Sequence, residues 1–119
     1  MTISDFFKDY NLHDSLLERV EYDKENKQIT FNIDFCYWQQ KNYTDDMQET
    51  GMITLVFSEV NDFDYTPFEI DSDEIISVQN NSENELYFEV CNDMTEECHS
   101  LRIKAKHVEF LENNKNDWP

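Results

Sequence analysis

Apolar and polar side chains alternate without a break from Gln28 to Trp38. One face of this segment carries Ile29, Phe31, Ile33, Phe35 and Tyr37, and the other carries Thr30, Asn32, Asp34, Cys36 and Trp38. A period of two is the pattern of a β-strand whose two faces meet different surroundings. Because a single strand cannot cover its own apolar face, this segment predicts an antiparallel sheet that curls or folds over.

Six further segments have the pattern or composition of strands. They are residues 16–22, 52–60, 63–70, 75–79, 85–91 and 100–108. Residues 16–22 also fit a helix that begins at the capping-box pair Ser15 and Glu18, and we favour the strand. Pro67 places its segment at a sheet edge, and the last two segments predict a hairpin across the polar loop 92–97.

A short helix is predicted over Ile3–Tyr10, with Ser4 as its N-cap. The fold class is therefore mainly β, or α+β with one short N-terminal helix: an antiparallel sheet of about seven strands, curled into a sandwich or a partly open barrel. The pattern leaves sandwich and barrel open. We expect a single domain over residues 1–119, with a polar tail at 112–119 that frays.

The charge of the chain constrains its partners. There are 27 Asp and Glu against 9 Lys and Arg, a formal net charge of -18 at pH 7. Aromatic residues make up 14% of the sequence, which indicates a folded core beneath this charge. A field of this sign repels nucleic acid and anionic membranes and speeds encounter with cationic proteins. The charge therefore predicts a basic protein as partner, and neither nucleic acid nor membrane.

Carboxylates are most concentrated between Asn61 and Glu74. On an extended chain, Asp62 and Asp64 share one side, and the three acids two residues apart further on also share a side. Such rows can receive Lys and Arg, with aromatic side chains between them as anchors. The predicted partner-binding residues are Asp45 and Asp46 in the loop 39–51, together with Asp62, Asp64, Tyr65, Glu69, Asp71 and Asp73. The alternative is a solvated edge whose charges prevent aggregation.

The outward face of the last strand carries the one basic stripe, Arg102, Lys104 and Lys106. In a hairpin, Glu85 and Glu89 of the preceding strand would face these cations. We therefore expect the basic stripe to be neutralised within the protein, which leaves the remaining surface negative.

No motif for metal binding or catalysis emerges from the sequence. An EF-hand counted from Asp71 would place Ile76 and Ser82 where glycine and glutamate are required. His13 and Asp14 are neighbours whose side chains point apart on an extended chain, so we expect no acid–base pair. Cys98 and His99 lack a CxxC-type partner pair for zinc, and a single glycine excludes phosphate-binding loops. We predict no catalytic residues, no metal, no cofactor and no enzymatic activity.

Three cysteines, Cys36, Cys91 and Cys98, form an odd set without CxxC spacing. This set favours free thiols in a reducing compartment, and a bridge between Cys91 and Cys98 stays open as the alternative. The N-terminal segment has neither a basic leader nor a long apolar run. A cytoplasmic location is therefore expected.

The segment LHDSLLERVEYDKENKQITFNIDF, residues 12–35, is followed by ITLVFSEV at residues 53–60. Together they resemble small β-rich bacterial proteins of unassigned function, some of which are immunity proteins of polymorphic toxin systems. The resemblance covers about half the chain. It implies a cytosolic protein that blocks a toxin by binding it, with His13, Asp14 and Ser15 in a structural turn.

The predicted function is therefore a non-enzymatic, stoichiometric inhibitor of a cationic toxin or other basic protein. Toxins that attack nucleic acid need basic clefts, and an acidic protein competes with phosphate for such a cleft. One alternative is a small-ligand-binding or enzymatic β-domain that uses Tyr37, Trp38 or His107. The other is a structural or oligomer-forming module.

Overall fold

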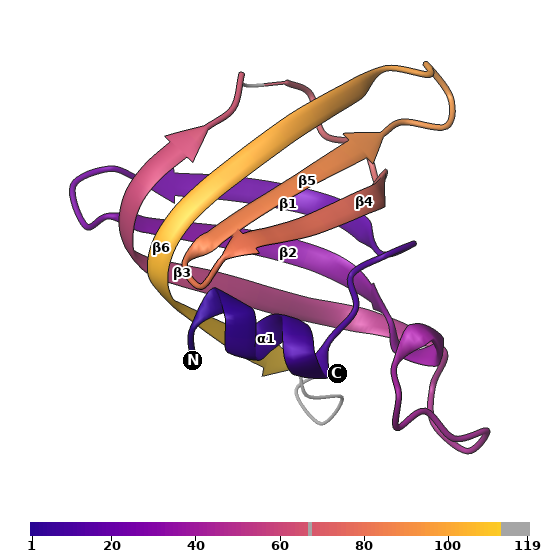
Figure 1. The fold of residues 1–119 in the computed structure, drawn as a ribbon. Helices are drawn as coiled ribbons and strands as arrows, with labels where there is room; N and C mark the ends of the chain where they lie inside the picture. Colours follow the sequence, from indigo (N-terminus) through magenta and orange to yellow (C-terminus); the bar gives the residue numbers. More distant parts are fainter. Residues whose placement is uncertain (67, 113–119) are drawn as a thin grey trace, which may run out of the picture.

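The computed structural model describes residues 1–66 and 68–112, and these form one short helix and six antiparallel strands in a single sheet (Figure 1). The elements are α1 (Ile3–Asp9), β1 (Leu16–Asp23), β2 (Gln28–Cys36), the 3-10 turn η1 (Tyr37–Gln39), β3 (Thr50–Asp64), β4 (Asp73–Ser82), β5 (Glu85–Cys91) and β6 (Cys98–Glu112). A mainly β fold with one short helix is confirmed. Of the tail predicted to fray, residues 113–119 lie outside the described part of the chain.

The prediction of about seven strands is wrong, because two predicted strands share one element. Residues 52–60 and the start of 63–70 belong to the continuous strand β3, which bends at a register shift between Val60 and Asp62. Residues 65, 66 and 68–70 are not in a strand. Residues 16–22 form the favoured strand, and β5 and β6 form the predicted hairpin.

The strand order is β1-β2-β3-β6-β5-β4, and the sheet curls until its outer strands meet. Strands β1 and β4 pair through Leu16 with Glu74 and Leu17 with Asp73. The main-chain bond from Ile75 N to Ser15 O, at 2.9 Å, extends this contact. We call the contact the β1–β4 seam. The sheet is therefore one curled layer that closes on itself only along a short stretch.

The core lies inside the curl and is rich in phenylalanine. Ile29, Phe31, Ile33 and Phe35 are all at most 1% exposed, as the alternation of β2 predicts. The Phe31 ring meets Phe57 of β3 edge-on at 5.4 Å and Phe88 of β5 at 5.5 Å. The alternation ends before the predicted position Trp38. Cys36 is buried rather than outward-facing, because the chain turns into η1 at Tyr37.

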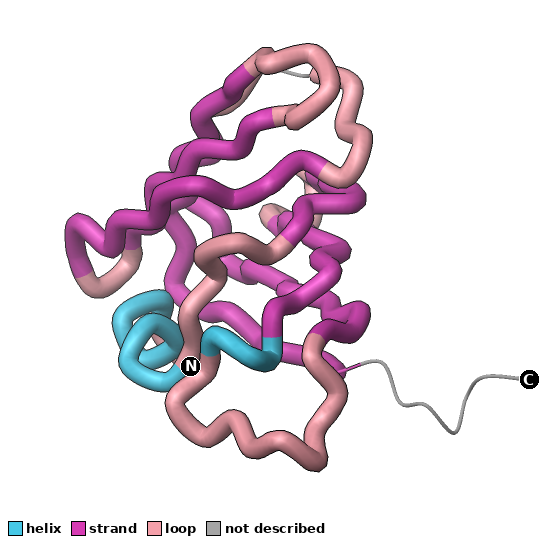
Figure 2. Tube along the Cα trace, turned by 90° about the vertical axis from the view of Figure 1, so that its right-hand side faces the viewer, coloured by secondary structure: helices cyan, strands magenta, loops and turns pink. Residues whose placement is uncertain are grey.

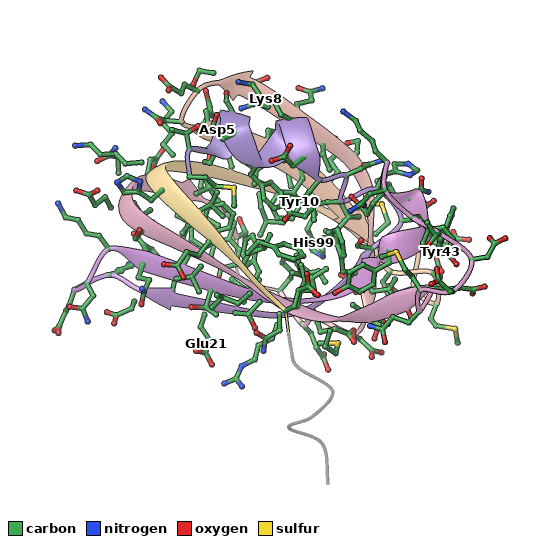
Figure 3. The ribbon with its side chains drawn as sticks, turned by 90° about the horizontal axis from the view of Figure 1, so that it is seen from below. Asp5, Lys8, Tyr10, Glu21, Tyr43 and His99 are labelled. Carbon is green, nitrogen blue, oxygen red and sulfur yellow. A yellow bond between two sulfur atoms is a disulfide. The ribbon has the colours of Figure 1, made fainter. Side chains whose placement is uncertain are left out.

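Helix α1 covers one open end of the curl. It is capped by Thr2, whose hydroxyl accepts from Asp5 N at 3.1 Å, and not by the predicted Ser4. The Ser4 hydroxyl instead donates to Asn80 of β4 at 2.9 Å. Figure 3 shows Asp5 and Lys8 on the outer side of the helix and Tyr10 turned toward the sheet, where its ring stacks on Phe110 at 4.3 Å. The opposite end of the curl is left to loops.

Candidate functional site

The eight residues predicted to bind a partner fall into two groups at opposite ends of β3. Asp45 and Asp46 are exposed in the loop before the strand, whereas Asp62 and Asp64 lie at its end. At a rise of about 3.3 Å per residue, a straight strand of 15 residues would be about 46 Å long, so β3 extends across the molecule, whose longest dimension is 39 Å, even with its bend. Figure 2 shows the two groups of loops at the bottom and top of the sheet. The structure therefore does not bring the eight residues into one surface.

Asp62 and Asp64 share a side of β3, as predicted, and both face Arg102 of β6. Arg102 Nη2 lies 3.1 Å from Asp64 Oδ2 and 3.8 Å from Asp62 Oδ2, and Arg102 Nε lies 3.8 Å from Glu85 Oε1. The predicted pairing with Glu85 is thus present, while Glu89 instead accepts from the Tyr87 hydroxyl at 3.2 Å. The Arg102 guanidinium therefore lies within ion-pair distance of three carboxylates.

The remaining predicted acids do not lie in a row along one strand, because residues 65, 66 and 68–72 are outside the strands. Glu69 and Asp71 are exposed, but Asp73 is only 1% exposed at the start of β4. Its Oδ1 accepts from Asp71 N at 3.3 Å and from Asn92 Nδ2 at 3.1 Å. Asp73 thus serves as an anchor for the chain entering β4, and its burial removes it from the surface that a partner can reach.

Aromatic pairs fix the rest of this segment. The Tyr65 ring stacks on Phe63 with centroids 4.3 Å apart and an interplanar angle of 16°. Phe68 stacks on His99 of β6 at 3.9 Å and 11°. The first contact fixes Tyr65 against the end of β3, and the second holds Phe68 against the β5–β6 hairpin.

Asn92 ties the hairpin loop to the same segment. Its Nδ2 donates to Asp71 O at 3.2 Å as well as to Asp73, and its Oδ1 accepts from the amides of Met94 and Thr95. The main chain closes the loop through Asn92 N and Glu97 O, 2.9 Å apart. Residues 68–72 and 92–97 therefore form one connected end of the molecule, at the top of Figure 1.

A disulfide joins Cys91 and Cys98, so the preference for three free thiols is wrong. The two residues lie directly opposite each other in the hairpin register, with Cα atoms 4.1 Å apart. Two cysteines that flank a predicted hairpin loop symmetrically are the sequence signal for this bridge. Cys36 is free and buried.

Loss of this disulfide should destabilise the protein by about 2 kcal/mol, because the bridge restricts the unfolded chain even when the loop is short. The double variant Cys91→Ser, Cys98→Ser measured in urea should show this decrease in the free energy of unfolding. Cys36→Ala is excluded as a control because that residue is buried; the matched control is wild-type protein with and without a dithiol reductant. Equal midpoints for oxidised and reduced protein would contradict the expectation.

Six exposed carboxylates surround the connected end. They are Asp64, Glu69, Asp71, Asp93, Glu96 and Glu97, and we call them the acidic rim. No Lys or Arg occurs in residues 64–72 or 92–100. Met94 stands at the tip of the hairpin loop with 89% of its surface exposed. The three rim acids at 93–97 are not among the predicted binding residues, although the predicted hairpin loop places them at a strand end.

Two hollows flank His99 within this end. The aromatic hollow, of about 320 Å³, has walls that include Asp64, Tyr65, Tyr87, His99, Ser100 and Arg102. The acidic hollow, of about 200 Å³, has walls that include Glu69, Asp71, Asp73, Asn92, Glu97 and His99. His99 Nε2 lies 3.9 Å from Glu97 Oε2. The acidic hollow thus combines four carboxylates with no Lys or Arg among the described residues of its walls, whereas the aromatic hollow pairs the carboxylate of Asp64 with Arg102.

His13 and Asp14 do contact each other, contrary to the prediction. Asp14 has a left-handed backbone with φ of 69°, which turns the two side chains together, and His13 Nδ1 lies 3.2 Å from Asp14 Oδ1. Gln39 Nε2 donates to Asp14 Oδ2 at 2.7 Å. The nearest thiol is Cys36, which donates to Asp14 O at 3.2 Å, and burial raises its pKa. A buried, protonated thiol is a poor nucleophile.

The residues of the alternative ligand site do not come together. His107 Nε2 lies 3.0 Å from Glu59 Oε2 on the β3–β6 surface. The Tyr37 hydroxyl donates to Glu112 at 3.2 Å, while Trp38 is 47% exposed in η1. Burial and the Glu112 carboxylate raise the pKa of Tyr37 to about 12, so its hydroxyl stays protonated at neutral pH.

Acidic side chains also crowd the β1–β4 seam. Burial raises the pKa of Glu74, and the neighbouring Asp93 and Asp14 carboxylates add to the rise, opposed by His13. Burial and the Glu18 carboxylate raise the pKa of Asp34. The folded protein therefore binds these protons more tightly than the unfolded chain does.

Stability should consequently fall as the pH rises through the raised pKa values of Asp34 and Glu74, above their ordinary values of 3.8 and 4.5. The stabilising contribution is complete below those ordinary values and is lost at higher pH. Urea unfolding of Glu74→Gln across the acidic range should show a smaller fall than wild type. Asp23→Asn is the matched control of opposite sign, because hydrogen bonds from Asn26 lower the pKa of Asp23. An unchanged pH profile for Glu74→Gln would contradict this account.

Among residues 1–66 and 68–112, no group of three or more His, Cys, Asp or Glu side chains is arranged to hold a metal ion. In that same part of the chain, the one α-helix is seven residues long, and none is long and apolar enough to cross a membrane. Comparison of the chain with protein-family models, with curated proteins and with solved structures finds no match.

Proposed function

We propose that the protein is a non-enzymatic, stoichiometric inhibitor of a basic protein. It would act as immunity proteins act on nuclease-type toxins. The observation that carries this proposal is the acidic rim: six exposed carboxylates in two segments that lack Lys and Arg. A rim of one sign favours a cationic surface and repels phosphate.

The rim is also held in place before any partner arrives. Asn92 and the Phe68–His99 stack connect its two loops, and the Cys91–Cys98 disulfide closes the base of the hairpin loop. A preorganised surface loses less conformational freedom on binding than a mobile one. In this proposal the curled sheet acts as a partly open barrel that presents the rim from a rigid scaffold.

An exposed apolar side chain within the rim supplies a second requirement of a specific interface. Met94 projects from the hairpin loop between Asp93 and Glu96 with 89% exposure. A flexible apolar side chain within a charged rim can fill a pocket on a partner, while the carboxylates steer the encounter.

Location in the cytoplasm stays a prediction, and the disulfide counts against it because cytosolic thiols are kept reduced. Alkylation of free thiols in intact source cells, followed by mass measurement, decides the point. Three alkylated cysteines would support the cytoplasm, whereas one would place the protein in an oxidising compartment.

The function is tested by capture of the partner on tagged full-length protein from source-cell lysate at low salt, followed by a salt gradient. The proposal expects one basic protein in stoichiometric amount, whose activity the protein then inhibits. The rim variant Glu69→Gln, Asp71→Asn, Glu97→Gln should lose this partner. The matched variant Asp9→Asn, Glu25→Gln, Glu109→Gln removes the same charge from exposed positions outside the rim and should retain it.

A separate variant, Asp45→Asn with Asp46→Asn, tests whether the loop before β3 also contacts the partner. Because that loop lies at the other end of β3, we expect this variant to bind the partner about as well as the wild-type protein does. Elution of many unrelated cationic proteins, equally from the rim variant and from the matched variant, would reject the proposed function.

A further inference from the structure

We propose that the aromatic hollow receives an arginine side chain of the basic partner. This inference rests on the proposed function and names the chemical group that the site would recognise. The hollow of about 320 Å³ lies beside the acidic rim and includes its member Asp64. That volume is at the lower limit of small-molecule sites and suits a single long side chain.

The charge around the hollow favours a cation. Its own walls carry one carboxylate, Asp64, and one cation, Arg102, whose Oδ2 and Nη2 atoms lie 3.1 Å apart. The excess of negative charge comes from the other five members of the acidic rim, which lie at the same end of the molecule in segments without Lys or Arg. This excess would repel an anionic ligand and attract a cation.

Asp64 has the capacity to bind that cation without losing Arg102. Its Oδ2 accepts from Arg102 Nη2 at 3.1 Å, and in the part of the chain that the structure describes no hydrogen bond reaches its Oδ1. The Asp64 side chain is 68% exposed. A carboxylate accepts about four hydrogen bonds, so an entering guanidinium can bind Oδ1 while Arg102 stays in place.

The walls of the hollow select a flat cation. Tyr65, Tyr87 and His99 contribute rings whose positions are fixed by the Tyr65–Phe63 stack, by the Tyr87–Ser100 hydrogen bond of 3.1 Å and by the His99–Phe68 stack. A guanidinium stacks on such rings and donates in its own plane to a carboxylate, whereas an ammonium is a compact, strongly hydrated charge. Arginine should therefore bind better than lysine.

The test is an NMR titration of the 15N-labelled, oxidised full-length chain with N-acetyl-arginine amide as the probe. We expect saturable shifts of the amides at 64–66, 87 and 98–102. The N-acetyl-lysine amide should bind at least threefold more weakly, and the neutral citrulline analogue should cause no saturable shift. Asp64→Asn should weaken binding of the arginine probe at least fivefold, whereas Glu25→Gln should leave it unchanged.

Equal binding of the arginine and lysine probes, or shifts spread over all acidic residues, would overturn the inference and indicate bulk charge alone. The outcome is separable from that of the proposed function. If the arginine probe fails to bind while a basic partner is still captured through the rim, the hollow has been misassigned and the function stands. If the probe binds but no partner is captured, the hollow is a guanidinium site without the proposed function.

Discussion

Amide substitution of three rim carboxylates, Glu69→Gln, Asp71→Asn and Glu97→Gln, should weaken binding of the basic partner about 100-fold, taking about 1 kcal/mol for each charge pair lost. All three side chains line the acidic hollow and are exposed at the connected end. Because rim charges act largely on diffusional encounter, most of the loss should lie in the association rate and should shrink with added salt.

Surface plasmon resonance at several salt concentrations measures both rates. The matched variant Asp9→Asn, Glu25→Gln, Glu109→Gln has the same net charge as the rim variant. An equal loss of affinity in the two variants would mean that total charge matters and its position does not, which would contradict a localised binding surface.

Asp73→Ala should lower the free energy of unfolding by about 3 kcal/mol. Asp73 is 1% exposed, and its Oδ1 accepts from Asp71 N and Asn92 Nδ2. Removal of the carboxylate leaves two donors without their acceptor at a site next to the β1–β4 seam, and hydrogen bonds to charged groups contribute more than neutral ones. Urea unfolding followed by circular dichroism measures the decrease.

Asp73→Asn is the matched variant, because an amide keeps an acceptor oxygen and removes the charge. We expect it to lose much less stability than Asp73→Ala. If the asparagine variant is destabilised as strongly as the alanine variant, then the charge and not the hydrogen bonding of Asp73 holds the start of β4. If neither variant loses stability, the anchoring role assigned to Asp73 is wrong.

Strand positions could be predicted where one periodic pattern decides the outcome. The alternation in β2 identified Ile29, Phe31, Ile33 and Phe35 as buried, and all four are. The hairpin of β5 and β6 followed from two such patterns around a polar loop. Strand number could not be predicted, because a bend inside β3 resembles a break between two strands when only the sequence is read.

Side-chain direction in irregular segments was the main source of error. Glu69, Asp71 and Asp73 were expected to share a face on the assumption of a strand, yet residues 65, 66 and 68–72 are outside the strands and Asp73 is buried. His13 and Asp14 were expected to diverge, and the left-handed backbone at Asp14 brings them together. A positive φ at a residue other than glycine is rare, so local pattern gives no reason to expect it.

The candidate site depended on contacts between distant segments. The sequence indicated an acidic run at 61–74 but not its neighbour at 92–97, because Asn92 and the Phe68–His99 stack connect them only in the folded state. Cys91 and Cys98 could have been paired from their symmetric places around the hairpin loop. Net charge suggested the class of partner, and the fold suggested where that charge is presented.

Carboxylate footprinting of the full-length chain, free and bound to the captured basic protein, tests the binding surface most directly. Exposed Asp and Glu are coupled to an amine with a carbodiimide and counted by mass spectrometry. We expect that modification of Glu69, Asp71 and Glu97 falls on binding, while modification of Asp9, Glu25 and Glu109 is unchanged. Protection of the second set, or no protection of the first, would contradict the assignment of the acidic rim as the binding surface.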